Sequence, residues 1–140
     1  MLHLMKLAVG VRDLAHLQEL QSARARAAPP LRHLTRNHPR RAAEVLDGGS
    51  IYWVIGGVML VRQRLLDIVA ATSSDGSPCA ALLLDPALVA VVPRPTRPFQ
   101  GWRYLAADAA PADLAQGAAA GGADSLPAAL RRELQALGLL

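Results

Sequence analysis

Residues 39–57, PRRAAEVLDGGSIYWVIGG, join a helical pattern to a glycine turn and to the only strand-like run that is rich in aromatic residues. Alanine, valine and leucine recur at helical spacing before Gly48, and glycine readily adopts the left-handed conformation that commonly ends a helix. We therefore predict a helix over 39–47 that Asn37 or His38 caps, with the proline in its first turn.

The run from Ile51 to Ile55 is dense in residues that favour β-structure. Successive side chains of a strand point to opposite faces, and both sets are apolar here. Strands of this kind are normally covered on both faces. We predict a central strand with the core on one side and a helix or loop on the other.

The chain before this strand is expected to form three further elements. We predict a strand over 3–9 and a strand over 31–36, on either side of a helix from an Asp13 cap to about Arg26. The buried stripe of that helix is predicted at Leu14, Leu17 and Leu20.

The chain after it shows short strand patterns separated by turn residues. Strands are predicted over 58–71, 79–84, 88–92 and 100–104. The Asp-Gly pair within 73–77 is a hairpin signal for the first two of these strands. Prolines at 93, 95 and 98 prevent regular pairing on both sides and favour an extended path.

Together these elements predict an α+β fold. We expect a curved, mainly antiparallel sheet of five to seven strands, or a small pseudo-barrel, with flanking helices. With 140 residues and 52% hydrophobic content, the chain is expected to form a single domain, 1–140. Residues 106–124 are predicted to be an Ala/Gly-rich connection, mobile over 117–123, to a C-terminal helix that starts at Ser125.

Composition excludes several classes of protein. The longest uncharged apolar run, 51–61, is about half as long as a membrane-spanning helix needs to be. The single Cys79 cannot form an intrachain disulfide. We expect a cytoplasmic protein that does not bind a membrane.

The charge distribution points to an anionic partner. The net charge is +4, and the segment between Glu19 and Glu44 holds six arginines and no acidic residue. Such a segment is typical of a surface that binds a polyanion. A compositional bias toward arginine and alanine would produce the same pattern, because arginine supplies fourteen of the fifteen basic residues.

No catalytic signature is present. The four histidines lack ligand spacing and no H-E-x-x-H or C-x-x-C motif occurs, so we expect no metal. Ser50 is not in a G-x-S-x-G turn, and Cys79 has no neighbouring cation in the sequence. No glycine-rich phosphate loop precedes a helix. We expect neither a cofactor nor catalysis.

The motifs DGGSIYWV, RQRLLDI and RPFQGWRYL, with the closing LPAALRRELQALGLL, resemble an uncharacterised bacterial family of about 140–150 residues, a domain of unknown function. This resemblance covers most of the chain and implies no established activity. A fainter likeness, in the order of elements alone, is to PUA-like and ASCH-like domains. It implies a small pseudo-barrel, while the polar residues of the ASCH-like pattern G-x-K-x-x-E-x-R are absent here.

We therefore hypothesise a non-catalytic module that binds nucleic acid, with RNA or another single-stranded nucleic acid as its partner. Arginines in a basic groove would contact phosphates, and aromatic side chains would stack on bases. The predicted site residues are Arg36, Arg40, Arg41, Tyr52, Trp53, Arg62, Arg64, Arg97, Gln100, Trp102 and Arg103.

Two other classes remain open. A small-ligand-binding protein or an enzyme would act on a phosphate- or carboxylate-bearing substrate in a closed cleft beside the 39–47 helix. An interaction protein would instead carry an exposed apolar patch.

We also predict that RPFQGWRYL packs against DGGSIYWV and that the two form one functional surface. Few aromatic residues occur in the chain, so two aromatic segments are expected to share one cluster. Arg97 or Arg103 would then reach the helix start at Arg40 and Arg41. The alternative is that Trp53 and Trp102 serve only the core, with Phe99 and Trp102 closing the end of the barrel.

Overall fold

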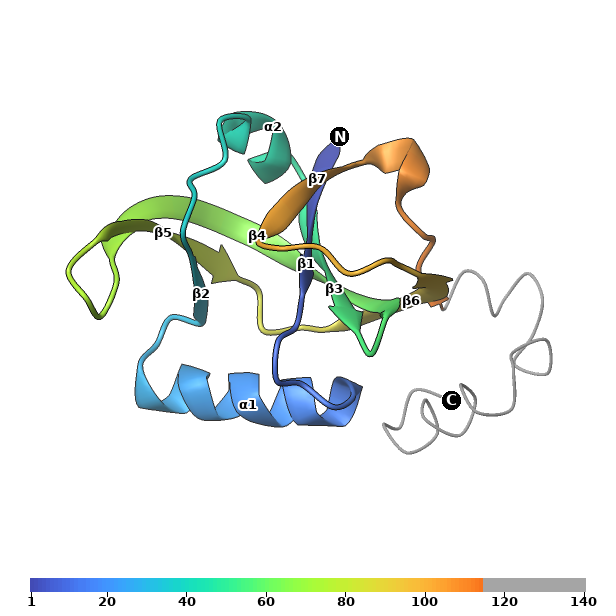
Figure 1. Cartoon of the computed structure of the whole chain (residues 1–140), viewed down its shortest axis with the longest axis horizontal. Coiled ribbons are helices and arrows are strands. Elements are labelled where there is room, and N and C mark those ends of the chain that lie inside the picture. Colours follow the sequence, from blue (N-terminus) through green and yellow to red (C-terminus); the bar gives the residue numbers. More distant parts are fainter. Residues whose placement is uncertain (115–140) are drawn as a thin grey trace.

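The structure, a computed structural model, describes residues 1–114, which form one seven-stranded sheet and two α-helices (Figure 1). The helices are α1 (Leu14–Ala27) and α2 (Ala42–Leu46). The strands are β1 (Leu2–Leu7), β2 (Arg32–Thr35), β3 (Ser50–Ile55), β4 (Val58–Thr72), β5 (Pro78–Leu84), β6 (Val89–Pro95) and β7 (Trp102–Ala106).

The sheet has the strand order β2-β5-β4-β3-β1-β7, and β6 pairs with β4 outside this path. Five of the six strand pairs are antiparallel, and β1 pairs with β3 in parallel. The predicted α+β, mostly antiparallel fold is confirmed. The expectation of a strongly curved sheet or pseudo-barrel is wrong, because the sheet is neither closed nor strongly curled and β2 and β7 stay at opposite ends.

The central position predicted for β3 is confirmed, since it lies between β4 and β1 and all its residues are buried. Ile51, Trp53 and Ile55 point into one apolar cluster, and Tyr52 and Val54 point into a second cluster on the opposite face. The period of two along a strand therefore divides this one run between two cores.

Helix α1 covers the first cluster. As predicted, Asp13 caps it, with its carboxylate accepting a hydrogen bond from the His16 backbone N–H at 2.8 Å. Leu14 and Leu17 are buried as expected, but the next buried residue on this face is Gln21 and not Leu20.

The opposite face of the sheet is covered by the chain segments that precede and follow β7 in the sequence. Phe99 packs into the second cluster, and Pro111 and Leu114 are buried. The described part of the predicted 106–124 connection thus lies on the sheet. The predicted mobile stretch 117–123 and the helix from Ser125 lie outside the described residues.

Glycines set the geometry at both ends of β3. Gly56 and Gly57 have φ values of 60° and 81°, as a two-residue hairpin between β3 and β4 requires. Gly48 ends α2 with a φ of 86°. A Cβ on Gly49 would lie 2.1 Å from the Val45 carbonyl oxygen, so only glycine fits where α2 meets the sheet.

Helix α2 is shorter than predicted and begins at Ala42, so Asn37, His38 and Pro39 lie outside it. The N-cap residue, Arg41, forms no side-chain capping hydrogen bond. The Tyr104 hydroxyl of β7 instead accepts a hydrogen bond from the Arg41 backbone N–H at 3.0 Å. A tertiary contact therefore sets the start of this helix.

Candidate functional site

The connection between β2 and α2 is held against β7 by two aromatic side chains. The Trp102 indole N–H donates to the Asn37 carbonyl oxygen at 2.9 Å, and Tyr104 accepts from Arg41. The two rings meet edge to face with centroids 4.9 Å apart. This arrangement fixes a basic loop beside two half-buried aromatic rings.

Arg41 is the most constrained arginine of this loop. Its guanidinium lies over the Tyr104 ring, 5.6 Å from the centroid, and its Nε donates to the Glu44 carboxylate at 2.8 Å. Part of its charge is therefore already compensated within the protein.

Six arginines, which we call the edge arginines, follow the chain from the end of α1 across β2 to the start of α2. Every one of them is exposed, and β2 is a terminal strand of the sheet. Figure 1 shows β2 running between α1 and α2, so the chain segment that carries these residues follows one edge of the sheet. Among the described residues, only Arg41 of this set forms an ion pair. The edge arginines are Arg24, Arg26, Arg32, Arg36, Arg40 and Arg41.

Tyr52 and Trp53 cannot provide the predicted stacking surface. Their exposed fractions are 4% and 2%, because β3 is covered on both faces. For this pair, the prediction of a central strand was right and the functional assignment was wrong.

The Arg62 guanidinium also forms its hydrogen bonds within the protein. Its Nε and Nη2 donate to the two Asp113 carboxylate oxygens at 2.6 and 2.8 Å, and its Nη1 donates to the Ser50 hydroxyl at 3.1 Å. The hydrogen bond from Arg62 lowers the pKa of Asp113, and the same bond raises the pKa of Arg62. The predicted phosphate contact at Arg62 is therefore replaced by a bidentate pair that holds residue 113 on the sheet.

His3 and Tyr52 complete this inner cluster. The rings meet edge to face at 5.0 Å, and His3 Nδ1 accepts from the Ser50 backbone N–H at 3.0 Å. Burial, and then the Arg62 charge, lower the pKa of His3, while burial raises the pKa of Tyr52. Both effects favour the neutral side chains beside the ion pair.

The remaining predicted residues are exposed and do not belong to the edge arginines. Arg64, Arg97 and Gln100 are exposed. Arg103 lies over the Phe99 ring, 5.1 Å from the centroid, and projects from the face of β7 opposite Trp102. The prediction that Arg97 or Arg103 reaches the α2 start fails for Arg103, and for Arg97 it stays a prediction.

The predicted proximity of the two aromatic segments is confirmed. Lys6 of β1 pairs with Trp53 on one side and with Trp102 on the other, and Trp102 packs against the cluster that contains Trp53. Two strand spacings separate the tryptophan backbones by roughly 10 Å. The two tryptophan side chains lie on the same face of the sheet, and strand β1 separates the two strands that carry them.

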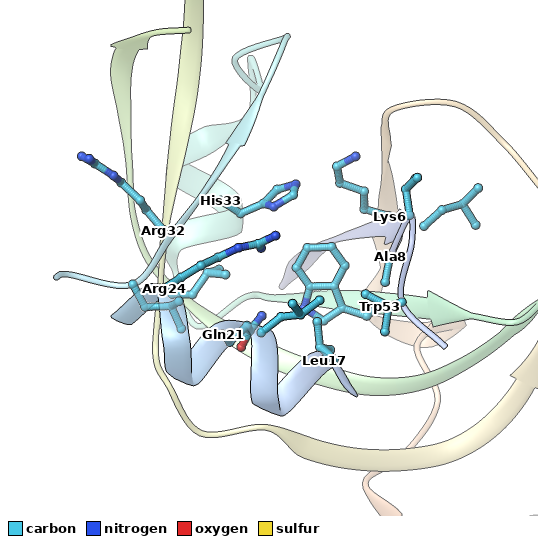
Figure 2. A pocket seen from close by; sticks show the side chains of 14 residues that line it. Lys6, Ala8, Leu17, Gln21, Arg24, Arg32, His33 and Trp53 are labelled. Carbon is cyan, nitrogen blue, oxygen red and sulfur yellow. The ribbon is translucent and has the colours of Figure 1, made fainter. Parts of the chain in front are cut away.

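A cavity of about 90 Å³ lies between α1, β1, β2 and β3, and sequence reasoning did not find it (Figure 2). Leu17 and Trp53 are among its apolar lining residues, while Lys6, Arg24 and His33 contribute basic groups. It is not beside α2, where a substrate cleft was predicted.

The basic groups of this cavity are close enough to influence each other. Burial, and then the charges of Lys6 and Arg24, lower the pKa of His33 to about 4. Burial also lowers the pKa of Lys6. The His33 ring meets Trp53 edge to face at 5.1 Å, and its buried Nε2 has no hydrogen-bond partner in the described residues.

The amides beside the cavity are fully engaged with each other. Gln21 and Gln63 exchange hydrogen bonds of 2.9 and 2.7 Å, and Trp53 donates to Gln63 at 3.1 Å. Gln63 also donates to the Asp85 carbonyl oxygen at 2.8 Å. The only sequence signal for this network is a glutamine on the inward face of β4 in the RQR motif.

Fold and geometry define an α+β protein with an arginine-lined sheet edge and a small basic cavity. A family model described as "Protein of unknown function (DUF1489)" matches residues 4–140, and the chain belongs to this family. The searches of curated proteins and of solved structures gave no match. Neither helix of residues 1–114 has the length and apolar character needed to cross a bilayer.

Proposed function

We propose that the protein binds single-stranded nucleic acid, RNA in particular, along the edge arginines and without catalysis. The observation that supports this most is the row of six exposed arginines on the chain segment that follows one edge of the sheet. Five of them have no carboxylate partner among the described residues. Their charges are therefore available to phosphates.

The aromatic pair gives the proposal a second contact. Trp102 and Tyr104 lie at the α2 end of the arginine row and are only half-buried. Unpaired bases stack on aromatic rings without sequence preference. An unpaired strand is favoured over a duplex, because only unpaired bases are free to stack on Trp102 and Tyr104.

The salt dependence of affinity tests the electrostatic part. Each phosphate neutralised on a single strand contributes a slope of about −0.7 to log K against log salt, so five arginines predict about −3.5. Between 50 and 200 mM KCl, affinity for a fluorescein-labelled mixed-sequence 12-nucleotide RNA should then fall by about 100-fold. Fluorescence anisotropy measures this directly.

A matched pair of variants locates the site. Arg32→Gln/Arg36→Gln should reduce the slope by about 1.4, at about 0.7 per lost contact. Arg12→Gln/Arg94→Gln removes the same charge from exposed positions outside the row. Its salt slope should therefore be steeper than that of Arg32→Gln/Arg36→Gln. Equal slopes for the two double variants, or an affinity that does not respond to salt, would overturn the proposal.

The aromatic contribution is tested separately. Trp102→Leu should weaken binding by about 5- to 100-fold, the range for loss of one base stack, at constant salt slope. An unchanged affinity would remove stacking on Trp102 from the proposal and leave only the arginine row.

A further inference from the structure

The cavity of Figure 2 has a polar side and an apolar side. Lys6 and His33 lie on one side of the Trp53 indole, and Arg24 extends from α1 next to them. Leu17, Trp53 and further leucine and valine side chains make up the rest of the lining. A molecule in this space would meet cationic groups at one end and hydrocarbon at the other.

The cationic end lacks an internal counterion. The two ion pairs found within residues 1–114 are Arg41–Glu44 and Arg62–Asp113, so neither Lys6 nor Arg24 is paired there. His33 Nε2 is buried without a partner. A half-buried ammonium without a carboxylate is costly unless an anion accompanies it.

The polar groups that could mask these charges are already used. Gln21 lines the cavity, but its amide is occupied by Gln63, and the Trp53 indole N–H donates to the same residue. No acidic residue lines the cavity. Among the side chains of the walls, the free hydrogen-bonding capacity is therefore concentrated on the basic residues Lys6, Arg24, Arg32 and His33.

We propose that this cavity binds a short aliphatic monocarboxylate, with its carboxylate between Lys6 and His33 and its alkyl chain against Leu17 and Trp53. Charge-assisted hydrogen bonds to the ammonium would hold the acid group. The alkyl chain would leave water for an apolar wall, which favours binding at about 0.8 kcal/mol per buried CH₂.

The volume limits the size of the ligand. A cavity of about 150 Å³ accommodates benzene. The present cavity is about 90 Å³, so the alkyl chain of the ligand should be smaller than a benzene ring, as in carboxylates of about two to four carbons. Phosphate fits less well, because several of its oxygens would face leucine side chains without a donor.

Binding can be followed on the full chain through Trp53. Trp102→Phe leaves Trp53 as the only tryptophan, and butyrate is titrated at constant ionic strength while its fluorescence is recorded. We expect a saturable change, with a matching shift of the His33 ring resonances in ¹H–¹³C spectra. Butyramide, a neutral molecule of nearly the same shape, should bind at least about tenfold more weakly, since it has no negative charge to pair with the Lys6 ammonium.

Variants separate the residues that line the cavity from the edge arginines that do not. In the same Trp102→Phe chain, Lys6→Met keeps the length of the side chain and removes its charge, and it should weaken butyrate binding by about 10- to 100-fold. Arg24→Gln should weaken it in the same direction. Arg26→Gln changes an exposed arginine of α1 that does not line the cavity, and it should leave affinity unchanged.

Several outcomes would overturn the proposal. These are no saturable change with butyrate, equal affinity for butyrate and butyramide, an unaltered affinity in folded Lys6→Met, or tighter binding of inorganic phosphate than of butyrate. Circular dichroism confirms the fold of each variant. The result can be told apart from nucleic-acid binding, because Arg36→Gln/Arg40→Gln changes two edge arginines that do not line the cavity and should leave butyrate affinity unchanged.

Discussion

Acidification should destabilise this protein through His33. The buried Nε2 of this residue has no hydrogen-bond partner among the described residues that would stabilise a protonated ring. Its pKa in the folded protein is about 4, against an ordinary 6.5, because the ring is buried and lies near Lys6 and Arg24. The folded state thus favours the neutral imidazole. Protonation would place a third positive charge beside two others without an anion.

The sign and size of the effect follow from linkage. Between pH 6.5 and pH 4 the unfolded chain binds a proton at His33 that the folded chain does not, so stability falls as pH falls through this window. From pH 7.5 to pH 5, the shift costs about 2 kcal/mol, and the full loss below pH 4 is about 3 kcal/mol. Above about pH 7.5 the contribution is constant.

Urea unfolding followed by far-UV circular dichroism at pH 7.5, 6.5, 5.5 and 5.0 tests this for wild type and His33→Leu. His3 also has a pKa lowered by burial, so both proteins should lose stability in acid. The difference in free energy of unfolding between wild type and His33→Leu isolates the contribution of His33. From pH 7.5 to pH 5, this difference should change by about 2 kcal/mol in favour of His33→Leu. His38→Leu changes an exposed histidine and serves as control.

Two results would refute the reasoning. One is a pair of parallel stability curves for wild type and His33→Leu. The other is a ¹H–¹³C titration in which the His33 ring of the folded protein titrates near 6.5. Either would mean that the ring is hydrated or paired with an anion in the folded state.

Three further perturbations test the packing around the site. Gln63→Leu should lower the free energy of unfolding, measured with urea, by about 3 kcal/mol, because several buried polar groups lose their partner. The double variant Gln21→Leu/Gln63→Leu should recover part of this lost stability. Gly49→Ala should abolish soluble expression or lower Tm by more than 10 °C or so, since its Cβ would overlap backbone oxygens of α2 and β1. Asp113→Asn should speed hydrogen exchange over 107–114 by weakening the bidentate pair with Arg62, while exchange in β3 stays slow.

The local elements were predictable because their signals are contained within a few residues. Asp13 followed by leucines at helical spacing predicts a capped helix, and α1 begins at Leu14. The Asp75-Gly76 pair predicts the hairpin that joins β4 and β5. In each case the backbone conformation depends on the turn or cap residue itself.

The start of α2 and the burial of Gln21 were not predictable in this way. Each depends on a residue far along the chain: Tyr104 accepts the hydrogen bond from Arg41, and Gln63 pairs with Gln21. A glutamine one position after Leu20 reads as solvent-facing until its partner on β4 is known. The overestimated curvature has a similar cause, because short strands and turns do not specify whether the end strands meet.

The error over Tyr52 and Trp53 came from two predictions that exclude each other. A strand apolar on both faces must be covered, and a covered aromatic ring cannot stack on a base from solution. Burial was the better-founded prediction because it followed from the period of the strand, whereas stacking followed only from residue type. The structure resolves the conflict in favour of burial.

The position of Trp53 then indicates what an aromatic residue in this strand can do. Gln63 accepts a hydrogen bond from its indole, His33 contacts its ring edge to face, and Lys6 is its neighbour on β1. Gln63 in turn is held by Gln21 of α1, so helix and sheet jointly fix the indole orientation. A ring fixed in this way is a rigid wall of the cavity, and the Lys6 ammonium beside it has no counterion among the described residues. Any direct role of this strand in recognition therefore concerns a ligand small enough to enter the interior, and polyanion binding has to rest on the edge arginines and on Trp102 and Tyr104 alone.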